Sequence, residues 1–285
     1  MKNRTLIMVG GPDSGKTNFL ARLVAHLRDG DGKLRAPDLP DDIQYVEEAL
    51  AYLMKGEFAP RSHNTTDELS GDITLDVREV DTGATATISV PDVSGETWDE
   101  VARTAEISRQ WLDRVQHADG ALLFVRVLSE LNVTPLDWVN TAPLLELAGP
   151  NPAYAIPSQV LLCQLLRLLQ ENLGTGLDTR PRVGIVVTAY DLLDTETRSK
   201  GPLSFLRDTY PLFAGMIDNV DDVEIGVFGA SVVGGELADV AFQNVYLEGD
   251  IVESGYVVDD TLIPMEQVGD ISRPVSWVLQ FQNST

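Results

Sequence analysis

Short, continuous apolar runs recur along the chain and predict strands. Such runs are typical of strands buried on both faces of a sheet, because neither face meets water. They occupy 5–9, 121–127, 182–188 and 223–228. Between them, apolar residues recur at intervals of three and four, which predicts amphipathic helices. These helices are expected over 18–27, 43–54, 98–116 and 158–172, within 203–217, and over 275–281, where Pro274 lies near the first turn.

Two further stretches alternate apolar and polar residues. They cover 72–80 and 84–90, and Asp81-Thr82-Gly83 separates them, a pattern typical of a β-hairpin. Strands that alternate with helices, with one hairpin added, predict a three-layer α/β fold with a mostly parallel central sheet and one antiparallel hairpin. We expect one domain over residues 1–285, with insertions near 29–60, 128–157 and 234–264. The last insertion is glycine-punctuated and is expected to add a hairpin.

The segment GGPDSGKT, residues 10–17, joins the first predicted strand to the first predicted helix. It matches the phosphate-binding (Walker A) pattern of Gly, four residues, then Gly-Lys-Ser/Thr. Small residues let backbone N–H groups curl around a β-phosphate, the lysine reaches the β/γ oxygens, and the threonine hydroxyl can bind Mg²⁺. The alternative is a glycine turn followed by a chance Gly-Lys-Thr. The strand before it and the helix after it favour phosphate binding.

A second chemical segment, Asp92-Val93-Ser94-Gly95, follows the second strand of the predicted hairpin. An aspartate there can hold a Mg²⁺-bound water, and the N–H of Gly95 can contact a γ-phosphate. Asp-x-x-Gly alone is a common turn sequence. Its place downstream of a phosphate loop is what favours the catalytic interpretation.

The charge balance limits the partners. The chain has 44 acidic and 21 basic residues, and a formal net charge of −23. Such a surface repels nucleic acid and anionic lipid, so we expect no nucleic acid partner. No apolar run approaches the ~20 residues of a membrane span, and the amino-terminal run is too short for a signal peptide. We therefore expect no membrane insertion and a cytoplasmic location.

Other reactive residues form no recognisable site. The single cysteine, Cys163, lies in an apolar helical run and is expected to pack there. The three histidines, His26, His63 and His117, are too far apart for metal-ligand spacing.

With these motifs in place, the sequence resembles the Ras-like branch of the translation-factor-class (TRAFAC) GTPases. The matching segments are GGPDSGKT, Asn64-Thr65-Thr66, DVSG, Thr188-Ala189-Tyr190-Asp191 and Gly229-Ala230-Ser231, in the family's order. PDVSGE and FGAS resemble more narrowly the GTPase domains of bacterial conflict systems, including the double-GTPases.

The resemblance implies GTP/GDP and Mg²⁺ as ligands. Thr66 or Thr65 would close over Mg²⁺ and γ-phosphate, with a loop threonine that binds no ligand as the alternative. Asp191 would accept two hydrogen bonds from the guanine edge, or would only cap a helix. The N–H of Ala230 would meet the guanine carbonyl. The resemblance also implies three sets of site residues. The nucleotide contacts are Gly10, Asp13, Ser14, Gly15, Lys16, Thr17, Asn18, Gly95, Thr188, Asp191 and Ala230. The metal contacts are Thr17, Asp92 and Thr66, and the catalytic residues are Lys16, Glu96 and Thr66.

The sequence departs from the family at several positions. Ala189 stands where a lysine packs over the base, so a cation–π contact is lost. Ser231 replaces a second lysine, a milder change. Glu96 stands where a water-orienting glutamine is common. Its charge is disfavoured beside a γ-phosphate, which indicates slow hydrolysis, but a first-turn glutamate also favours a helix dipole. Arg61 could act as an arginine finger in cis, or be a solvated surface residue.

The sequence therefore predicts a Mg²⁺-dependent GTP-binding switch with slow intrinsic or partner-stimulated GTP hydrolysis. It would signal to a protein partner, plausibly within a bacterial defence or conflict module. Two alternatives stay open at this point. One is a nucleotide-binding scaffold that does not hydrolyse, which Glu96 suggests. The other is a phosphate-loop ATPase or kinase, which the missing base-packing lysine suggests.

Overall fold

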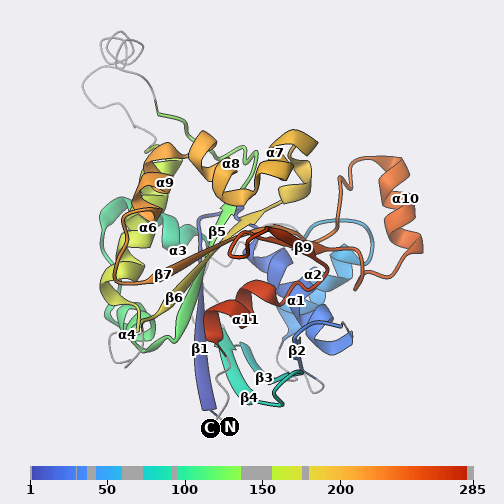
Figure 1. The fold of residues 1–285 in the computed structure, drawn as a ribbon, viewed down its shortest axis with the longest axis horizontal. Coiled ribbons are helices and arrows are strands. Elements are labelled where there is room, and N and C mark those ends of the chain that lie inside the picture. The colour runs from blue at the N-terminus through green and yellow to red at the C-terminus, as the bar shows by residue number, and fades with distance from the viewer. Residues whose placement is uncertain are drawn as a thin grey trace.

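A computed structural model gives the architecture. It describes residues 2–29, 31–36, 43–59, 73–90, 95–135, 156–174 and 180–280. Within these residues, nine strands form one sheet in the order β2-β3-β4-β1-β5-β6-β7-β8-β9 (Figure 1). The strands are β1 (Lys2–Val9), β2 (Leu34–Arg35), β3 (Ile73–Glu79), β4 (Thr85–Val90), β5 (Gly120–Arg126), β6 (Arg182–Thr188), β7 (Glu224–Ser231), β8 (Tyr256–Asp259) and β9 (Glu266–Val268).

The middle of the sheet is parallel and its two ends are antiparallel. The order β4-β1-β5-β6-β7 runs parallel throughout. The predicted hairpin is β3 and β4, and β2 pairs antiparallel with β3. At the other end, β8 and β9 form a second antiparallel hairpin beside β7, within and just beyond the 234–264 insertion. The predicted three-layer fold with a mostly parallel sheet is confirmed.

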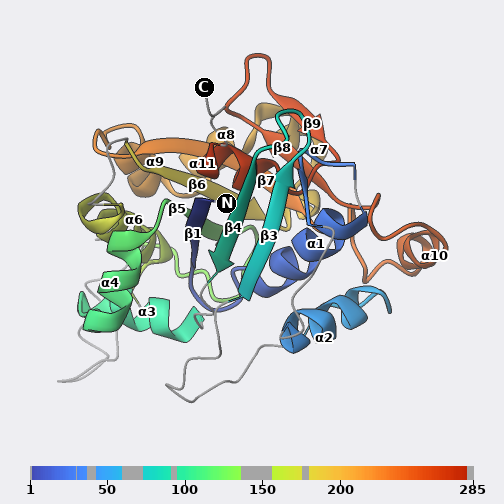
Figure 2. The same ribbon diagram turned by 90° about the horizontal axis from the view of Figure 1, so that it is seen from below.

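Helices cover both faces of the sheet. Figures 1 and 2 show α1 and α2 on one face, and α3, α4 and α6 on the other. The helices of the described residues are α1 (Lys16–Asp29), α2 (Gln44–Leu53), α3 (Gly95–Thr104), α4 (Arg109–His117), α6 (Ser158–Asn172), the 3₁₀ helix η1 (Tyr190–Leu192), α7 (Thr195–Lys200), α8 (Pro202–Thr209), α9 (Pro211–Ile217), α10 (Val240–Glu248) and α11 (Arg273–Leu279).

The structure divides or adds helices relative to the prediction. The long helix expected over 98–116 is two helices, α3 and α4, because Ala105 adopts a left-handed φ of 57° and Ser108 caps α4 by accepting from the Trp111 N–H. The helix expected within 203–217 is likewise split into α8 and α9, and Pro211 opens the second. The α10 helix was missed because 234–264 was expected to add only a hairpin. It lies beside the end of α2, where the Gln243 amide donates to the Gly56 carbonyl at 3.0 Å.

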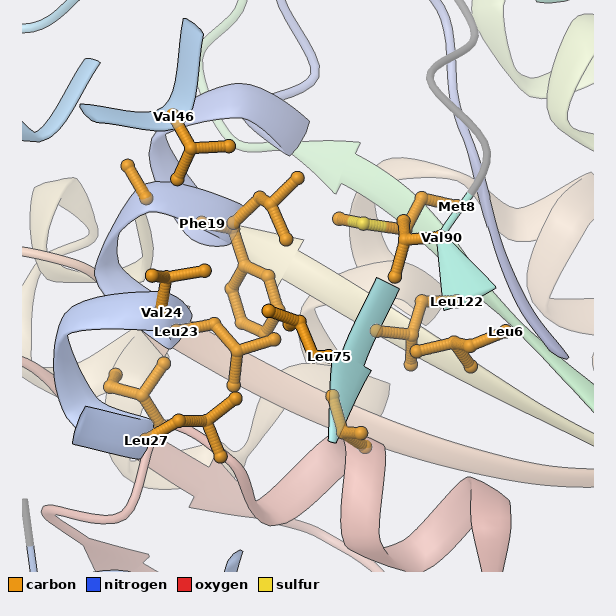
Figure 3. Packing of buried hydrophobic residues seen from close by; sticks show 14 of the residues in the cluster. Leu6, Met8, Phe19, Leu23, Val24, Leu27, Val46, Leu75, Val90 and Leu122 are labelled. Atoms are coloured by element: carbon orange, nitrogen blue, oxygen red, sulfur yellow. The ribbon is translucent and has the colours of Figure 1, made fainter. Parts of the chain in front are cut away.

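Successive side chains of the parallel strands point to opposite faces of the sheet, so the buried apolar residues form two clusters, one on each face. On β1, Leu6 and Met8 face α1, whereas Ile7 and Val9 face the opposite helices. Figure 3 shows Leu6 and Met8 of β1 in the cluster that also contains Phe19 of α1. Each fully buried side chain of this kind contributes about 1.5–3 kcal/mol. This double burial holds the carboxyl end of β1 and the start of α1 in fixed relative positions.

Buried polar contacts tie the carboxyl-terminal part of the chain to α1. Arg22 is fully buried. Its Nε donates to the Val232 carbonyl at 3.1 Å and its Nη2 donates to the Val252 carbonyl. Burial lowers the pKa of Arg22 to about 10. The loop that follows β7 is therefore attached to the helix that follows the phosphate loop.

A second contact pairs His26 of α1 with Asp270, at 3.0 Å between Nε2 and Oδ1. Burial disfavours the charged form of Asp270. Hydrogen bonds from His26, from the Ser272 hydroxyl and from the Lys33 N–H outweigh that effect and lower its pKa to about 2.

We predict that Asp270→Asn lowers the free energy of unfolding by about 2 kcal/mol at pH 7, since the ionised form is favoured by the fold. The folded-state pKa is depressed, so the stabilisation is present above pH ~4 and is lost as the pH falls toward 2. Urea unfolding of both proteins between pH 7 and pH 3 measures the difference. Asp29→Asn, which removes an exposed partner of Arg28, is the control and should change stability by less than ~0.5 kcal/mol. Equal stability of wild type and Asp270→Asn at pH 7 would show that the contacts of Asp270 do not stabilise its ionised form.

Candidate functional site

The glycine-rich segment forms a loop between the carboxyl end of β1 and the start of α1. Asp13 has φ of 59° and Gly15 has φ of 89°, both in the left-handed region. A Cβ on Gly15 would lie 3.0 Å from the Thr188 hydroxyl oxygen, so this position requires glycine for conformation and for space. The loop leads directly into the positive end of α1, as the phosphate-loop interpretation predicts.

Lys16, the first residue of α1, folds back over this loop. Its Nζ donates to the carbonyls of Gly10 at 2.6 Å and Gly11 at 3.1 Å, and to the Ser14 hydroxyl at 3.2 Å. The ammonium group thus lies against the loop, where a β- or γ-phosphate would meet it.

The next two residues connect the loop to its surroundings. Thr17 is half-buried in the first turn of α1. The Asn18 side-chain oxygen accepts from the Ala59 N–H at 3.2 Å. Ala59 is the last described residue before 60–72, and Thr65, Thr66 and Arg61 lie outside the described residues, as does Asp92. Asn18 therefore holds the chain at Ala59, and its role as a nucleotide contact stays a prediction.

The start of α3 lies directly against the phosphate loop. A Cβ on Gly95 would lie 2.5 Å from the Pro12 nitrogen and 2.7 Å from the Gly11 carbonyl carbon, so the two backbones touch. The buried Trp98 indole donates to the Met8 carbonyl at 3.1 Å, which anchors α3 to the end of β1. Glu96 is exposed in the first turn of α3. Gly95 therefore lies against the loop, its contact with a γ-phosphate stays a prediction, and Glu96 has the first-turn position of the alternative interpretation.

A second group of predicted residues lies at the carboxyl ends of β6 and β7. The buried Thr188 hydroxyl donates to the Ser14 carbonyl at 2.8 Å, which joins this group to the phosphate loop. Ala189 has a left-handed φ of 54° and turns the chain into η1, which carries Asp191. Burial raises the pKa of Asp191, and its hydrogen bond with Ser231 opposes that rise.

Ala230 and Ser231 lie inside β7 and are both buried. Ala230 is paired with Thr188 of β6 and with Val257 of β8. The Tyr190 ring lies over Gly229, where a Cβ would be 2.7 Å from the ring. Asp191 of η1 is thus hydrogen-bonded to Ser231 of β7, next to Ala230, and Thr188 at the end of β6 joins this group to the phosphate loop.

One contact of the phosphate loop was not predicted from the sequence. The Arg126 guanidinium, at the carboxyl end of β5, lies 2.8 Å from the Asp13 carboxylate, and Ser129 Oγ lies 3.4 Å from its other oxygen. The available signal was that Arg126 is a charged residue closing an apolar parallel strand, the edge at which ligands bind in open α/β sheets. These side chains line a hollow of about 510 Å³ between the loop, α3 and α6.

The residues present fit a nucleoside polyphosphate. The loop meets Lys16 and the start of α1 on one side and the Gly95 backbone on the other. Thr17 is the described member of the predicted Mg²⁺ set. Across the described ranges, no group of three or more His, Cys, Asp or Glu side chains gathers to hold a metal ion.

In the same ranges, no helix is long and apolar enough to cross a membrane.

A glycine loop between β1 and α1, with a lysine folded over it on a mainly parallel sheet, defines a phosphate-loop NTPase fold. The family model for Double-GTPase 1 matches residues 7–278. The chain belongs to the Double-GTPase 1 family, which confirms the resemblance seen in the motifs. Membership of a GTPase family implies binding of GTP or GDP.

Comparison with curated proteins gives no match. Among solved structures, elongation factor SelB from Methanococcus maripaludis, in complex with the GTP analogue GPPNHP, matches 80% of this chain and 30% of its own, at 14% identity and a TM-score of 0.34. The S. cerevisiae Ski7 GTPase-like domain, bound to GTP, matches 81% of this chain and 43% of its own, at 14% identity and a TM-score of 0.43. The chain spans less than half the length of either solved chain.

We predict that Gly95→Ala weakens the contact between α3 and the phosphate loop. The added Cβ would overlap the Pro12 backbone, and overpacking of this kind costs about 1–3 kcal/mol. Gly95→Ala should therefore unfold at a lower temperature and bind GDP more weakly than wild type. Gly215→Ala is the matched control, because nothing lies within 4 Å of its Cβ position; it should leave GDP binding unchanged. Unfolding and GDP affinity of Gly95→Ala equal to wild type would show that the two backbones do not touch.

Proposed function

We propose that the chain is a GTP-binding molecular switch that hydrolyses GTP to GDP and phosphate slowly. The observation that carries this proposal is the contact of Gly95 with the phosphate loop at Pro12 and Gly11, since the Gly11 carbonyl also accepts from Lys16. A group bound on the loop would therefore meet the start of α3. Loss of a γ-phosphate would remove that contact and release α3, as in switches that are ordered by a terminal phosphate.

The proposed steps use this chain's own groups. Backbone N–H groups of 13–17 and the positive end of α1 would bind the β-phosphate, and Lys16 would exchange its loop acceptors for β/γ oxygens. Thr17, with Asp92 and Thr66, would hold Mg²⁺, which when bound neutralises charge that develops on the phosphates. The Gly95 N–H would orient the γ-phosphate.

Base selection is assigned to Asp191. Its carboxylate would accept hydrogen bonds from the two N–H groups on the guanine edge, and the Ala230 N–H would meet the guanine carbonyl. The raised pKa of Asp191 means that burial already disfavours its charge, which two donors on the base would offset. Ala189 offers no cation above the base, so we expect a weaker grip on guanine than a lysine would give.

Slow hydrolysis is proposed from Glu96. Glu96 follows Gly95 in the first turn of α3, next to the glycine that faces the loop, and a negative charge there is unfavourable next to a γ-phosphate. A protein partner would then supply the missing catalytic group and receive the signal, within a bacterial conflict module if the family resemblance extends to role. The second candidate is a scaffold that binds without hydrolysis. The exposed, first-turn position of Glu96 favours it, since that position also suits a purely helix-stabilising role.

We predict that Lys16→Ala lowers the affinity for GDP with Mg²⁺ at least tenfold, because it removes the cation that faces the phosphates. Calorimetric titration of GDP and ADP into both proteins measures this, with wild type preferring GDP. Lys200→Ala removes an exposed lysine paired with Glu196 and should bind as wild type does.

Phosphate release from GTP over hours separates the two candidates. Slow release that disappears in Lys16→Ala supports the switch, and its absence with wild type supports the scaffold. Full GDP affinity in Lys16→Ala would contradict both.

A further inference from the structure

A carboxylate is built into the phosphate loop itself. Asp13 occupies the fourth position of GGPDSGKT, and its side chain is 22% exposed. An uncompensated anion at this point would repel a bound diphosphate or triphosphate, more strongly where water is partly excluded. The net charge of −23 already opposes anion binding. A loop that binds phosphate with Asp13 in it therefore requires local compensation.

That compensation comes from β5. Arg126 Nη1 lies 2.8 Å from Asp13 Oδ1, and the Arg126 side chain is 32% exposed. The Ser129 hydroxyl lies near the second carboxylate oxygen, at 3.4 Å. Both partners approach from the hollow between the loop, α3 and α6. Lys16, by contrast, contacts the carbonyls of Gly10 and Gly11 and the Ser14 hydroxyl.

We propose that Arg126 is a positioning residue that neutralises Asp13 and holds its carboxylate toward β5, away from bound phosphates. The loop then presents its N–H groups and Lys16 to the nucleotide without a competing anion. Arg126 acts through Asp13 and makes no contact with the nucleotide in this account. The assignment rests on the proposed function, since it concerns the same nucleotide site.

The experiment compares GDP affinity, in the presence of Mg²⁺, for wild type, Arg126→Ala, Asp13→Asn and the double variant. Arg126→Ala should bind about tenfold more weakly, because it leaves Asp13 charged and unpaired. Asp13→Asn should bind at least as tightly as wild type. The double variant should return to within about threefold of Asp13→Asn, a rescue that a merely structural role of Arg126 would not give. Arg167→Ala, which removes an exposed arginine paired with Glu171, is the control for net charge and should bind as wild type does.

Two results would overturn the proposal. Affinity of Arg126→Ala within about twofold of wild type would show that the pair does not matter. A double variant as weak as Arg126→Ala would assign Arg126 to the phosphates directly. Should Arg126→Ala fail to fold, Asp13→Asn alone decides: binding more than about threefold weaker than wild type would refute neutralisation. A wild-type protein that binds no nucleotide would refute the proposed function instead, so the two failures are distinguishable.

Discussion

The site depends on one constraint, the close packing of the phosphate loop against α3 and the carboxyl end of β6. Gly15 lies against Thr188, and Gly95 lies against Pro12 and Gly11. The Thr188 hydroxyl closes the arrangement on the Ser14 carbonyl. Because the Gly95 backbone meets the loop directly and only the Thr188 side chain lies between Gly15 and β6, a displacement of one segment is transmitted to the others. Phosphate loop, α3 and the carboxyl end of β6 therefore behave as one unit, held in place by the two apolar layers on either side of β1.

Electrostatics pose a second problem for this molecule. The chain is strongly acidic but must bind an anionic nucleotide. Its net charge repels the nucleotide at long range, so binding depends on short-range contacts at the site. Lys16 and the start of α1 supply positive potential at the loop, and the Arg126 pair removes the negative charge of Asp13. Away from the site, the buried Arg22 is likewise held by specific acceptors, the backbone carbonyls of 232 and 252. Arg22 and Arg126 are therefore both held by specific groups of the fold.

Much of this could be predicted from the sequence, for identifiable reasons. Buried parallel strands are continuous apolar runs, so the sequence predicts β1, β5, β6 and β7. The glycine loop could be predicted because its glycines, lysine and threonine have a fixed spacing. The break between α3 and α4 was missed because it depends on a left-handed Ala105 and a cap at Ser108, neither of which interrupts the apolar period. The contacts of Arg126 and Trp98 were missed because they join residues more than 80 positions apart. Thr66, Asp92 and Arg61 lie outside the described residues, and their roles stay predictions.

The central claim is that a guanine base lies on Asp191, and exchanging its hydrogen-bonding pattern tests that most directly. Guanine offers two N–H donors to a carboxylate, whereas xanthine carries a carbonyl in place of the amino group. We predict that wild type prefers GDP to XDP, and that Asp191→Asn, whose amide can donate to that carbonyl, reverses the preference. Titration of both nucleotides into both proteins gives the answer. An unchanged preference for GDP in Asp191→Asn would contradict the account.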